Sequence, residues 1–204
     1  GGNPSWPSHL GSFSGASYAA AVGVYKRINT LLYNVIPETD IRKQWWVDED
    51  LHSDLLNGQV WGEASGQDIP TYTITDVKMA YVPYTNVKFG MKSGIGSATN
   101  DCDWCIMRVE EMMLIEAEAV GMQDEARGIT LLANFAKTRD PEYVYGKHTN
   151  DTYGSNHATG FQNEVWWQRR VELWGEGFAT YDIKRFDKGV IRSYANTNHL
   201  AGYR

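Results

Sequence analysis

The segment between residues 105 and 141 carries two consecutive helical patterns, which constrain the fold more than any other stretch. The first is an apolar face made by Cys105, Val109, Met112, Met113, Ala117 and Val120. The second is an apolar face made by Ala126, Ile129, Leu132 and Ala136. Gly121 separates the two, Asp124 can cap the second, and Pro141 ends the pair. This predicts an antiparallel helix pair like a tetratricopeptide unit, although an ordinary helical hairpin fits the pattern too.

Two further stretches show helical spacing. The first is an apolar stripe over residues 16–34, ended by Pro37, and it consists of Tyr18, Val22, Tyr25, Ile28, Leu32 and Val35. The second consists of Trp167, Val171, Trp174 and Phe178, with Arg169, Glu172 and Glu176 expected as ion pairs along its flanks. Between them, residues 71–75 and 79–89 are rich in Thr, Tyr and Val, which favours short strands or extended loop. We therefore expect a mainly α fold with a loop-rich part that contains short strands.

Composition excludes several classes of function. The net charge of −6 argues against a nucleic-acid partner, because phosphate binding needs clustered Lys and Arg. The longest apolar runs, such as residues 112–115, are far shorter than the ~20 residues of a membrane-spanning helix. Hydrophobic residues make up 42% and charged residues 22%, as in a globular domain.

Signatures of catalysis are mostly missing from the sequence. It contains no G-x-S-x-G, H-E-x-x-H or phosphate-binding G-x-x-x-x-G-K motif. Carboxylates that are neighbours on a helix, such as Glu110 and Glu111, point in different directions and do not form a glycosidase pair by themselves. Cys102 and Cys105 form a lone C-x-x-C without a second ligand pair, and their redox state is left open. We expect no catalytic residues, no metal and no cofactor.

Aromatic side chains are unusually abundant, with 8 Trp and 12 Tyr. Trp6 and Trp61 stand in stretches rich in Gly, Ser or Pro, where a place in the core is less forced than on a helical stripe. A Trp face can stack on the C–H face of a sugar ring while polar neighbours bind the hydroxyl groups. Trp6 and Trp61, with Tyr18 as a weaker third, are the candidate glycan-stacking residues. The alternative is that each ring anchors its own loop to the domain.

Three motifs resemble those of the SusD/RagB family. Residues 167–178, WQRRVELWGEGF, and the following YDIKRF at 181–186 resemble the C-terminal signature of that family. Residues 107–119, MRVEEMMLIEAEA, resemble a second signature, and PETDIR at 37–42 resembles its P-x-T-D-x-R stretch. Asn198-His199 after Ile191-Arg192 is similar to a pairing seen in some members. The three motifs occur in the family's order and span about 150 residues.

This resemblance implies a SusD-like α–α superhelix with tetratricopeptide-like helix pairs and a loop-rich ligand-binding part. It implies non-catalytic binding of oligo- or polysaccharides at the outer-membrane surface and delivery to a SusC-like TonB-dependent transporter. The full-length protein would be a lipoprotein that contacts the membrane only through a lipid anchor outside this chain. Because family members are much longer, residues 1–204 are expected to be one SusD-like C-terminal portion of a longer chain.

The resemblance also assigns a structural role to the charged signature residues. The charged signature residues are Arg170, Glu172, Glu176, Asp182 and Arg185. They are expected to form a network that fixes the last helix in place. Two other interpretations remain open at this point. A carbohydrate hydrolase would use Glu or Asp residues, and a helical interaction scaffold would keep its Trp residues in the core.

Overall fold

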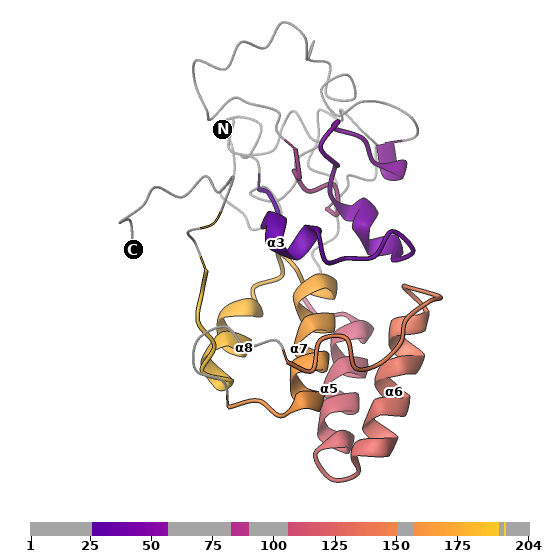
Figure 1. Ribbon diagram of the computed structural model, residues 1–204, viewed down its shortest axis with the longest axis vertical. Helices are drawn as coiled ribbons and strands as arrows, with labels where there is room; N and C mark the ends of the chain where they lie inside the picture. The colour runs from indigo at the N-terminus through magenta and orange to yellow at the C-terminus, as the bar shows by residue number, and fades with distance from the viewer. Residues whose placement is uncertain (1–25, 57–82, 90–105, 151–156, 192–193, 195–204) are drawn as a thin grey trace, which may run out of the picture. The chain divides into compact units, whose positions relative to one another are not determined.

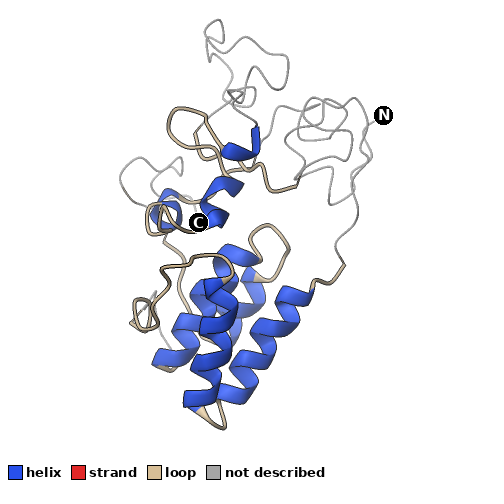
Figure 2. Ribbon diagram, turned by 90° about the vertical axis from the view of Figure 1, so that its right-hand side faces the viewer, coloured by secondary structure: helices blue, strands red, loops and turns tan. Residues whose placement is uncertain are grey.

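The computed structural model describes residues 26–56, 83–89, 106–150, 157–191 and 194 (Figure 1). Contacts divide the chain into two compact units, Gly1–Cys105 and Ile106–Arg204. In the part that is described, every named element is a helix, and Figure 2 shows helices and loops there but no strand. The prediction of a mainly α fold is therefore confirmed.

The second unit is built on three long helices that contact one another. They are α5 (Val109–Gly121), α6 (Glu125–Lys137) and α7 (Gly160–Glu172). Figure 1 shows them side by side, with α5 and α6 joined by a short turn. Asp124 caps α6 by accepting a hydrogen bond from the Arg127 amide at 3.1 Å, as the sequence predicts. The apolar core between the helices consists of Leu114, Ala117, Leu132, Phe135, Phe161 and Val165.

Glycines allow the helices of this unit to approach closely. A Cβ atom on Gly128 of α6 would lie 2.3 Å from the Cα atom of Gly121 in α5. A Cβ atom on Gly121 would lie 2.1 Å from the ring of Phe161 in α7. Because neither position has room for a methyl group, these two glycines set the distance between the helices.

The apolar face predicted for α5 is wrong at three positions and confirmed at Ala117. Val109, Met112 and Met113 are exposed, whereas Leu114 and Ala117 are fully buried. The buried face also includes Glu111. Apolar side chains occur on nearly every side of this helix, so spacing alone does not identify the side that packs against α6 and α7.

Helix α7 is buried along almost its whole length and ends earlier than its aromatic stripe suggests. Thr159 and Gln162 form a capping box at its start. Its last residue is Glu172, so Trp174 and Phe178 follow the helix and do not continue its stripe. The chain then forms the separate short helix α8 (Ala179–Arg185), which lies near α7 in Figure 1. Gly175 and Gly177, both with positive φ, make the bend between them.

The first unit contains shorter elements. Helix α3 covers only Thr30–Tyr33, followed by two 3-10 helices, η1 (Ile41–Trp45) and η2 (Asp54–Leu56). The extended residues 84–87 hydrogen-bond to residues 26–28 on one side and to residues 45–47 on the other. In residues 83–89 the expected strand therefore takes the form of isolated bridges, and residues 71–75 lie outside the described residues.

The helix predicted for residues 16–34 is wrong over residues 26–29 and confirmed over Thr30–Tyr33, and residues 16–25 lie outside the described residues. Arg27 is paired with Thr85 in an extended bridge, and Asn29 caps a helix that begins only at Thr30. Backbone pairing with a segment about 60 residues away prevails over local helical spacing at Ile28, which is still buried. In the part of the chain that the structure describes, no helix has the length and hydropathy to span a bilayer.

Candidate functional site

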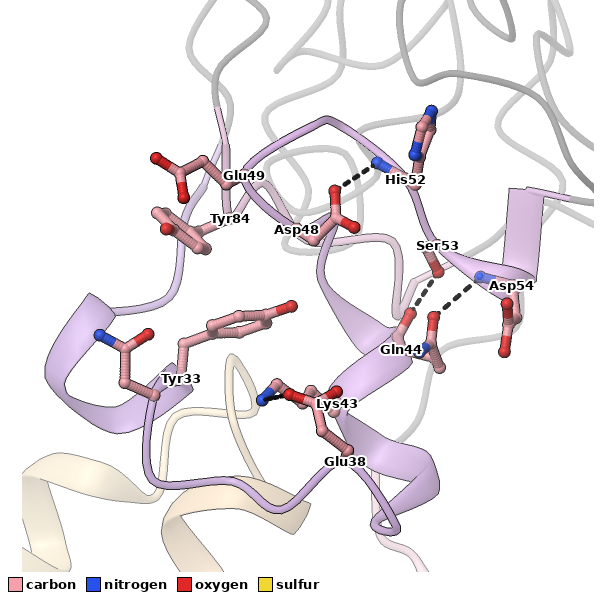
Figure 3. A pocket seen from close by; sticks show the side chains of 11 residues that line it. Tyr33, Glu38, Lys43, Gln44, Asp48, Glu49, His52, Ser53, Asp54 and Tyr84 are labelled. Carbon is pink, nitrogen blue, oxygen red and sulfur yellow. Dashed lines mark hydrogen bonds and ion pairs between the residues drawn. The ribbon is translucent and has the colours of Figure 1, made fainter.

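The first unit contains a polar pocket of about 380 Å³ (Figure 3). Its walls come from α3, η1, the loop between η1 and η2, and the extended segment that carries Tyr84. The lining residues are mostly polar or acidic: Tyr33, Asn34, Glu38, Lys43, Gln44, Asp48, Glu49, His52, Ser53, Asp54 and Tyr84.

Two tyrosine rings lie together in this pocket. The ring centroids of Tyr33 and Tyr84 are 4.9 Å apart with the planes tilted by 56°. Figure 3 shows Tyr33 reaching from α3 into the middle of the pocket. Tyr84 has a left-handed backbone with φ of 68°, and its amide donates to the Val47 carbonyl at 2.9 Å. This backbone pairing holds the Tyr84 ring next to Tyr33 despite the unfavourable φ.

Burial and acidic neighbours make both phenols weaker acids. Burial, followed by the charges of Asp48 and Glu38, raises the pKa of Tyr33 to about 12. Burial, followed by the charges of Glu49 and Asp48, raises the pKa of Tyr84. Both hydroxyl groups are therefore protonated near neutral pH and can donate or accept hydrogen bonds.

The acidic loop at the edge of the pocket is held by its own hydrogen bonds. Asp48 Oδ1 accepts from the amides of Asp50 at 2.9 Å and His52 at 2.8 Å. Ser53 Oγ donates to the Gln44 carbonyl, and the Asp54 amide donates to Gln44 Oε1 (Figure 3). Such side-chain to backbone bonds order a turn that lacks regular secondary structure.

A buried ion pair holds the start of η1, the helix that carries the pocket residues Lys43 and Gln44. Asp40 accepts from the Arg42 amide, which caps η1, and binds the Arg42 guanidinium with Nη2–Oδ2 at 2.6 Å. Both side chains are almost completely buried. Lys43, the next residue, pairs with Glu38, and its Nζ lies 5.1 Å from the Tyr33 ring centroid. The PETDIR motif therefore contributes the cap, the buried pair and the pocket residue Glu38.

This arrangement is suited to binding a polar organic molecule. Tyrosine faces can pack against C–H groups, while carboxylates and phenol hydroxyl groups bind hydroxyl groups. No cluster of three or more potential metal ligands occurs among the residues that the structure describes.

The charged signature residues occupy the second unit. Arg108 bonds to Glu172 through Nη1 at 3.0 Å and to Glu176 through Nη2 at 2.8 Å. Arg139 bonds to the other oxygen of Glu172 at 3.1 Å and to Glu110 at 3.0 Å. Glu172 is completely buried, so these two arginines balance its charge. The spacing suggested ion pairs along one helix. In the structure these ion pairs join different elements instead.

A second network joins α7, α8 and α5. The carboxylate of Asp182 accepts from Arg169 at 2.9 Å and from Arg185 at 2.8 Å. Arg185 also forms a bidentate pair with Glu118. The guanidinium carbon of Arg170 lies 4.5 Å from the Trp166 ring centroid, within the range of a cation–π contact. Four of the five signature residues are thus placed in two ion-pair networks, and Arg170 lies over an aromatic ring.

The stacking residues suggested by the sequence, Trp6, Tyr18 and Trp61, lie outside the described residues. Sequence reasoning did not find Tyr33 and Tyr84. They are 51 positions apart, and the pairing of residues 84–87 with residues 26–28 and 45–47 brings them together. The one available signal was that Tyr33 lies just before the PETDIR motif.

A profile of the SusD family matches residues 33–203, which is most of the chain. The chain therefore belongs to the SusD family, and the membership inferred from the three motifs is confirmed. Members of this family are in general non-catalytic carbohydrate-binding proteins of nutrient uptake at the outer-membrane surface, where they work with SusC-like transporters. No curated protein and no solved structure matches the chain.

Proposed function

We propose that this chain binds oligosaccharides without altering them and delivers them to a SusC-like TonB-dependent transporter at the outer-membrane surface. Membership of the SusD family supports the general role. The observation that carries the proposal for this chain is the pocket around Tyr33 and Tyr84, where two aromatic rings are surrounded by hydrogen-bonding groups.

The pocket has the properties that a sugar site needs. Tyr84 is only half-buried, so a ligand can reach its ring. Gln44 and Asp48 also line the pocket, and their side-chain oxygens can accept hydrogen bonds from sugar hydroxyl groups. The proposal keeps Trp6, Trp61 and Tyr18 as additional stacking residues and residues 1–204 as one portion of a longer SusD-like protein. The charged signature residues are proposed to act on the fold and not on the ligand.

Isothermal calorimetry of the chain against a panel of neutral oligosaccharides tests the proposal. We expect saturable binding to at least one of them and no release of reducing ends during long incubation. Replacing Tyr84 by Ala should weaken that binding about tenfold, since one sugar–ring contact is lost.

The matched control is Tyr181→Ala, because Tyr181 is 72% exposed and lies outside the pocket. It should bind like the unmodified chain. Trp6→Ala and Trp61→Ala, measured in the same series, test the two stacking residues proposed from the sequence. If no oligosaccharide binds, or if Tyr84→Ala binds as well as Tyr181→Ala, this pocket is not a sugar site.

A further inference from the structure

The pocket around Tyr33 and Tyr84 carries more negative charge than its own cation can balance. Lys43 is the lysine in its lining, and Lys43 is paired with Glu38. Asp48, Glu49 and Asp54 form no ion pair with any of the residues described in the structure. The region next to the two rings is therefore electronegative, and that favours a positively charged ligand.

The Tyr33 hydroxyl group provides a second, uncharged binding group in the same pocket. Tyr33 is only 9% exposed, and its phenol oxygen forms no hydrogen bond to any residue in the described ranges. Figure 3 shows this side chain within the pocket. A hydroxyl group that lies in the pocket without a described protein partner can donate to or accept from a ligand that enters it. This observation is independent of the acidic residues and also points to a ligand.

The chain itself shows that an ammonium group is accepted near these rings. Lys43 Nζ lies 5.1 Å from the Tyr33 ring centroid, within the range of a cation–π contact. The raised pKa values of both tyrosines, caused first by burial and then by the acidic neighbours, reflect the same negative potential. A potential that disfavours a phenolate also disfavours a carboxylate or sulfate on a ligand.

We propose that this pocket selects glycans with a protonated amine, that is, amino sugars, and discriminates against glycans with carboxylate or sulfate groups. The proposal rests on the proposed function and adds to it the charge class of the sugar. The amine would lie near Asp48 and Glu49, and sugar hydroxyl groups would bind the Tyr33 phenol. A basic peptide shares the positive charge, but the unpartnered hydroxyl and the ring pair favour a sugar.

Calorimetry with three β-1,4-linked tetrasaccharides tests this preference, because they differ only at C2. They carry an amine (the glucosamine tetramer), an N-acetyl group (the N-acetylglucosamine tetramer) or a hydroxyl group (cellotetraose). The experiment is run at about pH 5.5, because the neighbouring C–O bonds make the sugar amines weaker bases than an α-amino group, and at this pH they are largely protonated. We expect the amine form to bind about tenfold more tightly than the other two, with an advantage that shrinks as salt is added.

Asp48→Asn is the decisive variant, because asparagine keeps the side-chain oxygen that accepts from the Asp50 and His52 amides. It should weaken binding of the amine form much more than binding of cellotetraose, and so remove most of the advantage of the amine form. Asp50→Asn is the matched control, because Asp50 is exposed and does not line the pocket. It should keep the preference.

The outcomes separate this proposal from the proposed function. Equal affinity for the three tetrasaccharides, or an equal loss for all three in Asp48→Asn, overturns the amine preference and leaves sugar binding intact. Tighter binding of a galacturonic acid tetramer than of the glucosamine tetramer also overturns it. Binding of tetralysine with no binding of any sugar overturns both proposals.

Discussion

Arg108 holds Glu176 in a bidentate ion pair, with Nε to Oε2 at 3.0 Å and Nη2 to Oε1 at 2.8 Å. The two residues are 68 positions apart and belong to two different signatures of the family. Arg108 also donates to the backbone carbonyl of Glu172, which is in the last turn of α7. One guanidinium at the start of α5 thus fixes the end of α7 and the bend that follows it.

Replacing Arg108 by Met should lower the free energy of unfolding by about 2 kcal/mol, because the buried Glu172 carboxylate loses one of its two arginines. The loss is expected below the full cost of an unpaired buried charge, since Arg139 remains and Arg108 is 19% exposed. Chemical denaturation followed by circular dichroism measures this change.

Arg127→Met is the matched control for that prediction. Arg127 is exposed on α6, and the residues described around it give its side chain no ion pair. Its effect should stay within about 0.5 kcal/mol. Equal stability of the two variants would mean that the Arg108 network does not hold the helices together.

Gly128→Ala should destabilise the second unit by about 3 kcal/mol, because the new methyl group would meet the backbone of Gly121 at 2.3 Å. The intrinsic helix propensity of Ala acts in the opposite direction, by about 1 kcal/mol in a helix interior. The clash should prevail because its nearest atom is backbone and the helices would have to move apart. Thermal unfolding measures the outcome.

Gly160→Ala gives the comparison, because it places the same methyl group in a helix where there is room. Its nearest neighbour would be Thr149 Cβ at 3.5 Å, an ordinary contact. This variant should be unchanged or more stable by about 0.5 kcal/mol. If Gly128→Ala is as stable as Gly160→Ala, the close approach of α5 and α6 is not needed for the fold.

Local patterns in the sequence predicted the helix pair and its cap but not the contacts between distant segments. Asp124 and Pro141 mark their positions through chemistry that acts within a few residues. The buried side of α5 depends instead on α6 and α7, and the partners of Glu172 come from two other elements. Spacing carries no information about such partners. Arg169 and Glu172, which the spacing suggested as a pair along the helix, bind Asp182 and the two arginines Arg108 and Arg139 instead.

In the pocket too, local features could be predicted from the sequence and contacts between distant residues could not. Residues 37–42 could be recognised as a motif, and the structure shows that Asp40 caps η1 and pairs with Arg42. Tyr33 and Tyr84 could not be linked in advance, since their contact depends on two bridges between extended segments. The left-handed backbone of Tyr84 could not be predicted either, because the sequence marks such a conformation only where a glycine occupies the position.

His148 should make the second unit less stable in acid. Burial, then the charges of Arg170 and Lys147, lowers the pKa of His148 from 6.5 to about 4, and its ring stacks on Trp167 at 4.0 Å. The unfolded chain therefore binds this proton first as the pH falls. Stability is complete above pH 6.5 and is lost progressively down to about pH 4, by about 1–2 kcal/mol for a partly exposed ring.

His148→Gln isolates this contribution. The pKa of Glu164 is raised, first by burial, so Glu164 favours the folded state as the pH falls and opposes the effect of His148. Because Glu164 is present in both proteins, the difference between their profiles of unfolding free energy against pH belongs to His148. The variant should lose the acid-dependent decrease between pH 6.5 and 4. Parallel profiles over that interval would contradict the prediction.

Asp40→Ala should destabilise η1. The buried Arg42 side chain would lose its carboxylate partner, and η1 would lose its cap. Lys43 and Gln44 belong to η1, so the pocket wall should become mobile with it. Native-state hydrogen exchange should show faster exchange at the Lys43 and Trp46 amides, which donate to the carbonyls of Asp40 and Lys43. Asp40→Asn can keep the capping acceptor and should retain part of the protection. Since the buried pair and the cap make separate contributions, equally fast exchange in both variants would assign the stability of η1 to the ion pair alone.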